Sequence, residues 1–488
     1  MERRSLLLAI ASLFFWCVSQ PAIAAYNHGG ADTDSPVFLS AYPDAQGSKL
    51  DSCALCHSGG QYESKPGKWV TLGSCQWCHF IYGYDKQGDI GDTLNPYGQD
   101  YLAAGRGGGA LTDIAGLDSD DDGFSNGDEI AALRFPGNAE DDPDKIHAPF
   151  RVYSREELQT WPQHSQFLLM NTHKSGDYYA TYGGVPVAEL LDRAGVLPMA
   201  SGLTAFAPDG WAQYHPLEPD PDPLLYHVYG FYPAAPYYYK EEADEALNDV
   251  YGWCNYSAPA CKDQIPGEVI DNDGGLQMLL AITRDGADLE TGVLGKDNKL
   301  DGEGPFRLVP PQKLPGPPDQ GSISENQNVA WPFDEDADHN AGFATRTTTM
   351  IRVEPMPPGT TDIDILEAGW NYVDEAKVIV YGAVDPLPTV KGRLDDLGRM
   401  LREAPARSFK NFIDKWLLIF NIEKVKRMID KGAYKGVIAM VESHLLSRTD
   451  GFLKGSGFDR NDWITDDDLQ RKTYRSLHEI VVLMNIIA

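Results

Sequence analysis

Two short cysteine clusters decide the organisation of the N-terminal part of the chain: Cys53-Ala54-Leu55-Cys56-His57 and Cys75-Gln76-Trp77-Cys78-His79. In each cluster two residues separate the cysteines and a histidine follows directly, which is the attachment signature of c-type heme. Thiols at this spacing reach the two vinyl groups of one porphyrin, and the adjacent imidazole ligates the iron. A zinc site or a redox-active disulfide could use the same residues, but two copies that each end in histidine favour heme. We therefore expect two covalently bound hemes, held by Cys53, Cys56, Cys75 and Cys78, with His57 and His79 as proximal ligands.

A count of the methionines and histidines in this region limits the candidates for the distal ligands of these hemes. Residues 2–169 contain no methionine, so a local methionine ligand is not available to either iron. His28 and His147 are the spare histidines of the region, and we expect them to complete bis-histidine coordination. Without the methionine ligand that raises the potential, low reduction potentials are expected. The alternative for His147 is a surface position at a domain boundary, and the reserve candidates are His164 and His173.

The spacing of the two clusters indicates that the hemes lie close together. The clusters begin 22 positions apart, inside a region of about 125 residues with an expected radius of gyration of ~14 Å. Neighbouring hemes whose axial positions are filled favour electron relay over chemistry at the iron.

A second motif follows at residues 118–129, Asp-Ser-Asp-Asp-Asp-Gly-Phe-Ser-Asn-Gly-Asp-Glu, which matches the twelve-position calcium loop. Gly123 supplies the sharp turn. Because the glycine run 107–109 interrupts the approach, no long helix is expected before the loop. We therefore expect the single-helix loop of extracellular bacterial proteins rather than a full helix-loop-helix sensor, and a structural role for Ca²⁺. The alternative is a solvated acidic turn. The expected calcium ligands are Asp118, Asp120, Asp122, the backbone carbonyl of Phe124, Asn126 and Glu129.

The first 24 residues predict export. Arg3 and Arg4 precede an apolar run over residues 6–18, and Ala22-Ile23-Ala24 is typical of a signal-peptide cleavage site. The run is shorter than the ~20 residues needed to cross a bilayer, so a membrane anchor is disfavoured, and no later segment predicts a membrane span. We expect a mature protein in the periplasm or on the outer surface of a bacterium.

The charge balance limits the partners. The chain has 72 acidic and 41 basic residues, a formal net charge of −31. This charge disfavours nucleic acid and anionic membrane surfaces as partners. We expect redox protein partners, among them other cytochromes.

The pattern of apolar residues predicts a multidomain α+β protein. After the signal peptide (1–24) and a ligand-organised diheme cytochrome region (25–150), residues 151–392 hold short apolar runs between long Pro-, Gly- and Asp-rich stretches, which indicates a β-rich domain. In that domain Cys254 and Cys261 predict a disulfide, since the compartment is oxidising. Residues 393–488 predict a three-helix bundle, with helices over 408–430, 434–446 and about 466–487. The first of these helices carries its apolar residues at Phe409, Phe412, Ile413, Trp416, Leu417, Phe420, Val425, Met428 and Ile429.

The middle region resembles the molybdopterin-binding domain of the sulfite oxidase family. The similar stretches are residues 181–196, 207–210, 279–281 and 302–310 (Gly-Glu-Gly-Pro-Phe-Arg-Leu-Val-Pro). In that family a cysteine thiolate on an early strand binds molybdenum, whereas the similar stretch here, 168–171, reads Leu-Leu-Met-Asn. The resemblance therefore implies a shared fold, while bound molybdopterin is not expected.

Two further resemblances concern the ends of the chain. The N-terminal region is similar to diheme cytochrome domains of exported bacterial proteins, in which paired attachment motifs precede an Asp-rich calcium loop. Residues 450–453 and 461–464 resemble the end of small helical modules on bacterial surface proteins, and this likeness carries no catalytic residue.

Three functions are compatible with these features. The first is an electron carrier with two c-type hemes, which is not an enzyme. The second is a molybdenum oxidoreductase that passes electrons to the hemes. The third is a calcium-dependent surface or assembly protein. Nucleophilic hydrolysis and phosphate-loop chemistry lack recognisable motifs.

Overall fold

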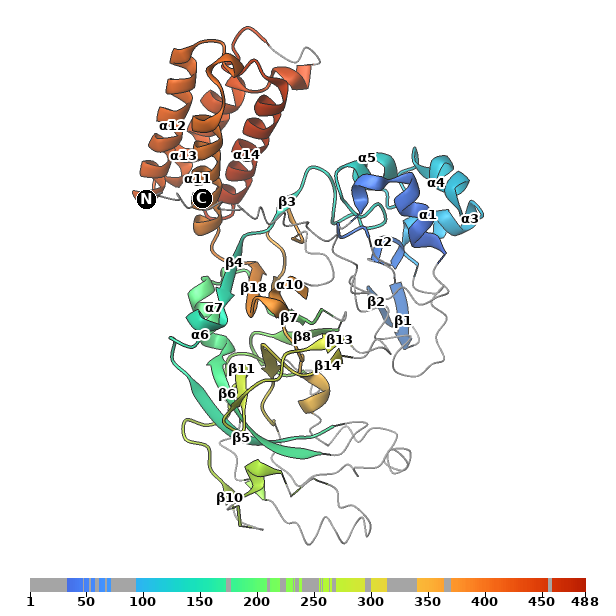
Figure 1. Cartoon of the computed structure of the whole chain (residues 1–488), viewed down its shortest axis with the longest axis vertical. Helices are drawn as coiled ribbons and strands as arrows, with labels where there is room; N and C mark the ends of the chain where they lie inside the picture. The colour runs from blue at the N-terminus through green and yellow to red at the C-terminus, as the bar shows by residue number, and fades with distance from the viewer. Residues whose placement is uncertain are drawn as a thin grey trace, which may run out of the picture.

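The computed structural model confirms the mixed α+β class (Figure 1). It describes residues 33–46, 48–51, 54–57, 61–65, 68–71, 94–172, 177–208, 211–219, 225–230, 232, 237–238, 254, 256, 258–262, 264–265, 269–294, 300–313, 340–363, 370–454 and 459–488. The predicted signal peptide lies outside these residues. In the described part of the chain, no helix has the length and apolar character of a membrane span.

The N-terminal region consists of short helices and one hairpin around a small apolar core. Phe38, Leu55 and Tyr97 are among the buried core residues. Short helices with few apolar residues form a small core, which leaves room for bound ligands to contribute to folding. The elements are α1 (Asp34–Ala41), α2 (Ala54–His57), β1 (Gln61–Lys65), β2 (Lys68–Thr71), α3 (Pro96–Ala103), α4 (Gly108–Ile114) and α5 (Asn126–Ala131), with the 3₁₀ turn η1 (Pro43–Ala45).

The middle region is built on two five-stranded sheets that share one large core. One sheet has the order β12-β11-β6-β5, with β15 paired to β11, and all of its pairs are antiparallel. Its strands are β5 (His164–Met170), β6 (Tyr178–Pro186), β11 (Leu279–Arg284), β12 (Ala287–Asp288) and β15 (Arg307–Val309).

The second sheet has the order β4-β18-β16-β7-β8. Only its β16–β18 pair is parallel. Its strands are β4 (Phe150–Ser154), β7 (Gly202–Phe206), β8 (Ala212–Pro216), β16 (Met350–Glu354) and β18 (Lys377–Gly382).

Shorter elements complete the middle region. The paired short strands are β3 (Ile146–His147) with β17 (Thr360–Thr361), β9 (Tyr237–Tyr238) with β10 (Val269–Ile270), and β13 (Val293–Leu294) with β14 (Leu300–Asp301). The helices are α6 (Arg155–Leu158), α7 (Val187–Ala194), α10 (Trp370–Asp374), η4 (Pro259–Cys261) and η5 (Asn340–Phe343).

The C-terminal bundle has one helix more than the sequence predicted. α11 (Leu387–Glu403) packs with α12 (Phe412–Asp430) and α14 (Asp467–Asn485), and α13 (Tyr434–Met440) also packs with α12 and α14. α11 does so because Val390, Leu394, Leu397 and Leu401 recur at helical spacing and are buried in the bundle core. The expected boundary after residue 392 therefore falls inside α11. α13 continues as the π-helix η8 (Val441–Leu445). Short 3₁₀ helices follow at η9 (Leu446–Arg448) and η10 (Gly451–Lys454), and another, η7 (Ala406–Ser408), lies between α11 and α12.

The outward face of α12 differs from what the apolar spacing predicted. Phe412, Ile413, Trp416 and Phe420 are 45 to 72% exposed, so they lie outside the core. The buried residues of α12 are Leu418, Asn421, Ile422, Val425 and Ile429. A helix with apolar residues all round does not reveal from sequence alone which face is covered.

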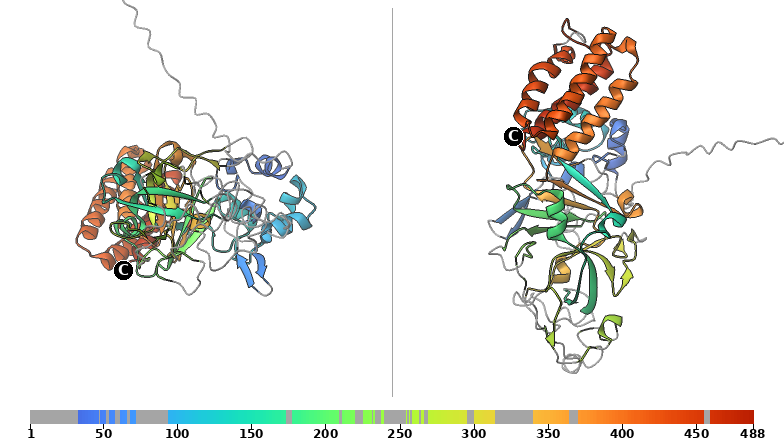
Figure 2. Two further views of the ribbon diagram at one scale, coloured as in Figure 1. Left: turned by 90° about the horizontal axis from the view of Figure 1, so that it is seen from below. Right: turned by 90° about the vertical axis from the view of Figure 1, so that its left-hand side faces the viewer.

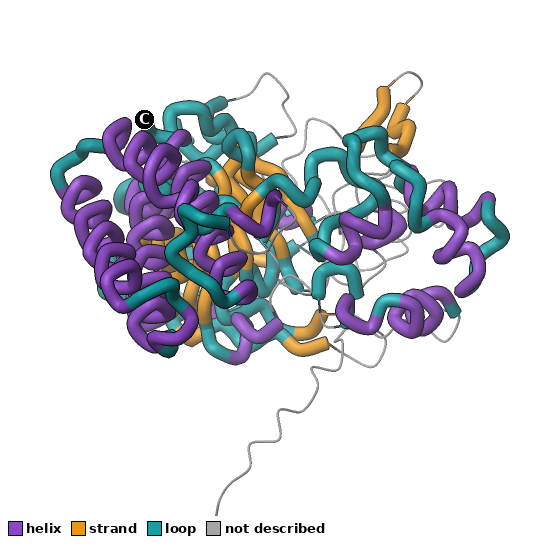
Figure 3. The backbone as a smooth tube through the Cα atoms, turned by 90° about the horizontal axis from the view of Figure 1, so that it is seen from above, coloured by secondary structure: helices purple, strands orange, loops and turns teal. Residues whose placement is uncertain are grey.

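The helical bundle lies at one end of the molecule, and the N-terminal region lies beside the middle sheets (Figure 2). Seen from above, strands occupy the centre with helices on either side (Figure 3). The buried carboxylate of Asp141 joins the regions, since it pairs with Lys49 at 2.7 Å and accepts a hydrogen bond from Thr361. The parallel pair of β3 with β17 reinforces this junction.

Candidate functional site

Helix α2 contains the second half of the first cysteine cluster and is held against the start of α3. Asn95, which is fully buried, makes this connection. Its Oδ1 accepts a hydrogen bond from the Gly98 amide at 2.8 Å and so caps α3, while its Nδ2 donates to the carbonyl of Leu55 at 2.9 Å. The Asn95 amide also donates to the Cys56 carbonyl at 2.8 Å. Asn95 therefore fixes α2 relative to α3.

The two helices approach so closely that only glycine fits at position 98. An added Cβ at Gly98 would lie 2.5 Å from the Cys56 carbonyl oxygen and 3.1 Å from the Cys56 Cβ. Real Cβ atoms do not come this near to a backbone oxygen, so a larger residue would push α2 away from α3.

A Gly98→Ala substitution is expected to lower the free energy of unfolding of this region by about 1 to 3 kcal/mol, the usual range for overpacking, and to reduce heme incorporation. The measurement is the melting temperature together with the heme-to-protein absorbance ratio. Gly109→Ala is the matched control, because no atom lies within 4 Å of its added Cβ. Equal heme incorporation in the two variants would contradict the role of this contact.

Tyr97 lies beside α2, and its hydroxyl is in the protein interior. It is fully buried, and burial followed by the proximity of Cys56 raises the pKa of its hydroxyl far above the ordinary value. The Tyr97 Oη has no hydrogen-bond partner among the described residues. An orphaned hydroxyl next to Cys56 fits a polar group of a bound cofactor, such as a heme propionate.

Most of the other predicted heme residues lie outside the described part of the chain. This holds for Cys53, the second cluster at 75–79, His28 and the side chain of His57. Cys56 is half-buried and packs against the small N-terminal core. The predicted heme attachment and proximal ligands therefore stay predictions.

The structure places His147 at the junction of the N-terminal region and the helical bundle. His147 ends β3 and lines a cavity of about 390 Å³ together with Lys145 and, from α14, Tyr474, His478 and Glu479. This is the domain-boundary position that the alternative interpretation gave it, and its role as a distal ligand stays a prediction. Of the reserve histidines, His164 bonds to the Gly275 carbonyl in the middle region, and His173 lies outside the described residues.

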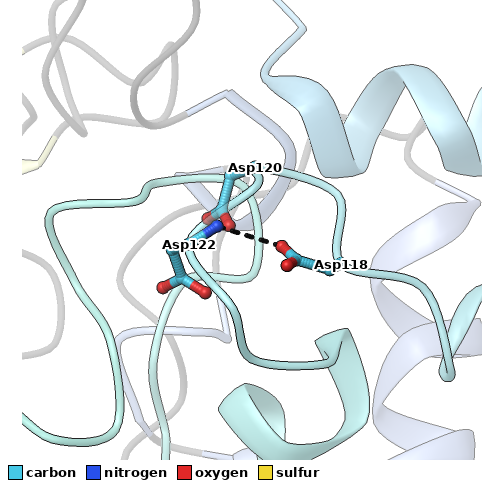
Figure 4. A group of neighbouring side chains, drawn as sticks. All are labelled: Asp118, Asp120 and Asp122. Carbon is cyan, nitrogen blue, oxygen red and sulfur yellow. Dashed lines mark hydrogen bonds between the residues drawn. The ribbon is translucent and has the colours of Figure 1, made fainter.

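The predicted calcium loop brings its acidic residues together (Figure 4). One oxygen from each of Asp118, Asp120 and Asp122 lies within 4.8 Å of the others. The loop bends because Gly123 adopts a φ of 102°, and the Asp118 carboxylate accepts hydrogen bonds from the amides of Asp122 and Gly123 at 3.1 and 2.9 Å. The turn thus gathers the first three predicted ligands in one place.

The unsatisfied oxygens of this loop indicate a cation. Glu129 is fully buried, yet neither of its carboxylate oxygens has a hydrogen-bond partner among the described residues. The two carboxylate oxygens of the half-buried Asp120 have no such partner there either. Burial and then the neighbouring Asp120 and Asp122 raise the pKa of Glu129 to about 9. Burial and Asp122 raise the pKa of Asp120 to about 6. A divalent cation would satisfy these oxygens and remove the repulsion.

Helix α5 and Asn126 hold the end of the loop. The Ser125 side chain caps α5 by accepting from the Asp128 amide at 3.2 Å. The Asn126 Nδ2 donates to the Ile114 carbonyl at 2.7 Å, and its Oδ1 accepts from the Ser119 amide at 3.3 Å. Asn126 therefore braces the loop, and its role as a ligand, like that of the Phe124 carbonyl, stays a prediction.

A short helix precedes this loop and begins inside the glycine run. α4 begins at Gly108 and ends at Ile114, four residues before Asp118, so no long helix leads into the loop among the described residues. Glycine disfavours a helix interior but is tolerated in a first turn, where tertiary packing of Ala110 and Leu111 stabilises the helix. The loop is thus flanked by a short helix on each side.

The middle region buries the stretch 168–170, where the resemblance to the sulfite oxidase family led us to look for a metal-binding cysteine. Leu168, Leu169 and Met170 on β5 are almost completely buried in the large core. The nearby polar residues form an ion cluster: Arg307 donates to Glu303 and to Tyr182, and Arg284 donates to Glu303. Burial alone would raise the pKa of Glu303, but Arg307 and Arg284 lower it to about 2. The Glu303 carboxylate is therefore ionised and paired with both guanidinium groups.

The other cysteines of the middle region are both in its core. Cys254 is 3% exposed and Cys261 is 7% exposed. Their disulfide stays a prediction.

Sequence reasoning missed Asn95, Tyr97 and Gly98. The Asn95-Pro96 pair is a typical helix start and could have located α3. Nothing in the sequence, however, indicates that α3 packs against α2. Comparison with models of known protein families gave no match, and comparisons with characterised proteins and with solved structures gave none either.

Proposed function

We propose that this protein is an exported electron carrier that relays electrons through two covalently bound c-type hemes and is stabilised by calcium. The observation that carries the proposal is the pair of Cys-x-x-Cys-His clusters at 53–57 and 75–79. The fixed position of α2 against α3 and the orphaned hydroxyl of Tyr97 support it.

Different residues of the chain would attach the hemes, ligate the irons and position the first cluster. Cys53 and Cys56 would hold one heme and Cys75 and Cys78 the other, with His57 and His79 on the irons. A bound heme supplies reversible one-electron transfer at its iron. Asn95 and Gly98 position α2, and the buried Tyr97 keeps water away from the side of α2 that it covers.

Calcium supports this function by stabilising the N-terminal region. Its apolar core is small, and an ion bound by Asp118, Asp120, Asp122 and Glu129 would connect the loop to α5. Binding free energy of this kind is folding free energy. The acidic surface implied by the net charge of −31 favours redox partners with basic docking surfaces.

A visible spectrum with a pyridine hemochrome count tests the proposal. We expect two c-type hemes for each secreted chain, and an oxidised spectrum without the weak band of methionine-to-iron coordination. Unmodified cysteines, or bound zinc, found by intact mass spectrometry would overturn the electron carrier. Metal analysis separates the enzyme alternative, since stoichiometric molybdenum in the purified protein would favour an oxidoreductase.

A further inference from the structure

We propose that the C-terminal helical bundle holds a second divalent-cation site, formed by the carboxylates of Asp450, Asp459 and Asp462 and completed by Gln470. This site does not depend on the hemes or on the calcium loop. Its residues come from the turn after η9, from the segment before α14 and from α14 itself.

The three carboxylates converge although they are well separated in sequence. One oxygen of each lies within 4.8 Å of the others. The spacing of positions 450, 459 and 462 does not match the twelve-position calcium loop, so the folded chain and not a linear motif creates the group.

Asp462 gives an independent indication of a ligand. It is fully buried, and its Oδ1 has no hydrogen-bond partner within the described part of the chain. Its other oxygen accepts hydrogen bonds from the Asp459 amide at 2.7 Å and from the Gln470 Nε2 at 2.8 Å. A carboxylate oxygen kept from water without a partner is unfavourable unless a cation binds it.

Gln470 extends the same pattern. It is 1% exposed, its amide nitrogen contacts Asp462, and its Oε1 also has no hydrogen-bond partner among the described residues. A side-chain amide oxygen is a typical Ca²⁺ ligand, and this one belongs to a residue that contacts Asp462.

The ligand chemistry favours calcium over softer metals. All four side chains offer oxygen, which suits hard cations such as Ca²⁺ and Mg²⁺. The calcium loop shows the same combination of gathered carboxylates and unsatisfied buried oxygens at Asp120 and Glu129. The two sites thus share one physical signature.

A cation here would fasten the segment before α14 to the rest of the bundle. The Trp463 amide already donates to the Arg448 carbonyl at 2.9 Å, and the Lys410 amide donates to the Trp463 carbonyl at 3.0 Å. The ion would add a cross-link from the turn at Asp450 to α14 through Asp462 and Gln470, and so stabilise the bundle against unfolding.

Calcium titration of the full-length, heme-loaded protein tests the site. We expect two ions for each wild-type chain and one for each single variant, Asp462→Asn or Glu129→Gln, whereas the double variant should bind none. Asp468→Asn is the control, because this exposed α14 carboxylate pairs only with Lys472 among the described residues and its loss should leave both ions.

Terbium luminescence gives a readout that needs no bundle variant. Trp463 is adjacent to Asp462 in sequence, so Tb³⁺ at this site should be sensitised by tryptophan excitation in the Glu129→Gln protein. Absence of that luminescence and of any calcium binding in Glu129→Gln would overturn the proposal. So would a folded Asp462→Asn protein that still binds two ions.

Discussion

A Cys53→Ala/Cys56→Ala variant is expected to carry half the covalent heme of the wild-type protein. Each thioether bond needs one of these thiols, and the second cluster at 75–79 is separate in sequence, so one heme should be lost and one retained. The measurements are the pyridine hemochrome count for each chain and the intact mass, which should fall by one heme in addition to the two sulfur atoms.

The remaining cysteines provide the matched control for this variant. Replacing Cys254 and Cys261 with alanine also removes two sulfurs, but from the core of the middle region, and should leave both hemes in place. If the two double variants keep the same heme content, the first cluster does not attach heme.

Loss of the first heme should also weaken the N-terminal region. Leu55 is buried in its small core, and the Cys56 carbonyl receives the Asn95 amide. Without the porphyrin, α2 keeps these contacts and the hydrogen bond from the Asn95 side chain to the Leu55 carbonyl, but a four-residue helix is not stable by itself. The unfolding of this region should therefore begin at a lower temperature than that of the sheets and the bundle.

The sequence predicts ligands for the candidate sites, but it does not predict the contacts that surround them. The loop at 118–129 could be assigned residue by residue, because calcium loops impose a fixed spacing on their ligands. The contact of Gly98 with Cys56 could not, since it joins residues 42 positions apart and depends on how two helices cross. The same reason hid the group formed by Asp450, Asp459 and Asp462.

Among the helices, too, some features could be predicted from the sequence and others could not. Apolar periodicity identified α12 and α14. Their capping residues, Asn411 and Asp466, accept hydrogen bonds from the backbone amides of Asp414 and Leu469. Periodicity did not reveal that Trp416 and Phe420 are exposed. α11 was missed because it begins only a few residues after β18, where the chain still matched the pattern of the β-rich region.

A Glu129→Gln substitution is expected to abolish the response of the N-terminal region to calcium. In the wild-type protein, calcium at a hundred times its Kd should raise the free energy of unfolding by about 2.7 kcal/mol, which is several degrees in melting temperature. Glutamine keeps the shape of the side chain but cannot clamp the ion with two charged oxygens. Thermal unfolding with and without calcium measures the difference.

Asp121→Asn is the control for this variant. Asp121 lies in the same loop, is exposed, and has a φ of 60°, which asparagine tolerates. It occupies a position of the loop that supplies no ligand, so its variant should respond to calcium as the wild-type protein does. A Glu129→Gln protein that gains as much stability from calcium as this control would disprove the site.

The pH dependence separates the ion from a merely acidic turn. Without calcium, the folded pKa of Glu129 is about 9, above its ordinary value of 4.5, so the folded state holds a proton that the unfolded state releases. That contribution to stability is complete below pH 4.5 and is lost as the pH rises towards 9. The calcium-free protein should therefore melt at a lower temperature at about pH 8.5 than at about pH 6. With saturating calcium the ion replaces the proton, and this loss should disappear. Glu129→Gln, which is neutral at every pH, should lose less stability over this range than the calcium-free wild type; an identical loss in both proteins would mean that Glu129 does not carry the proton.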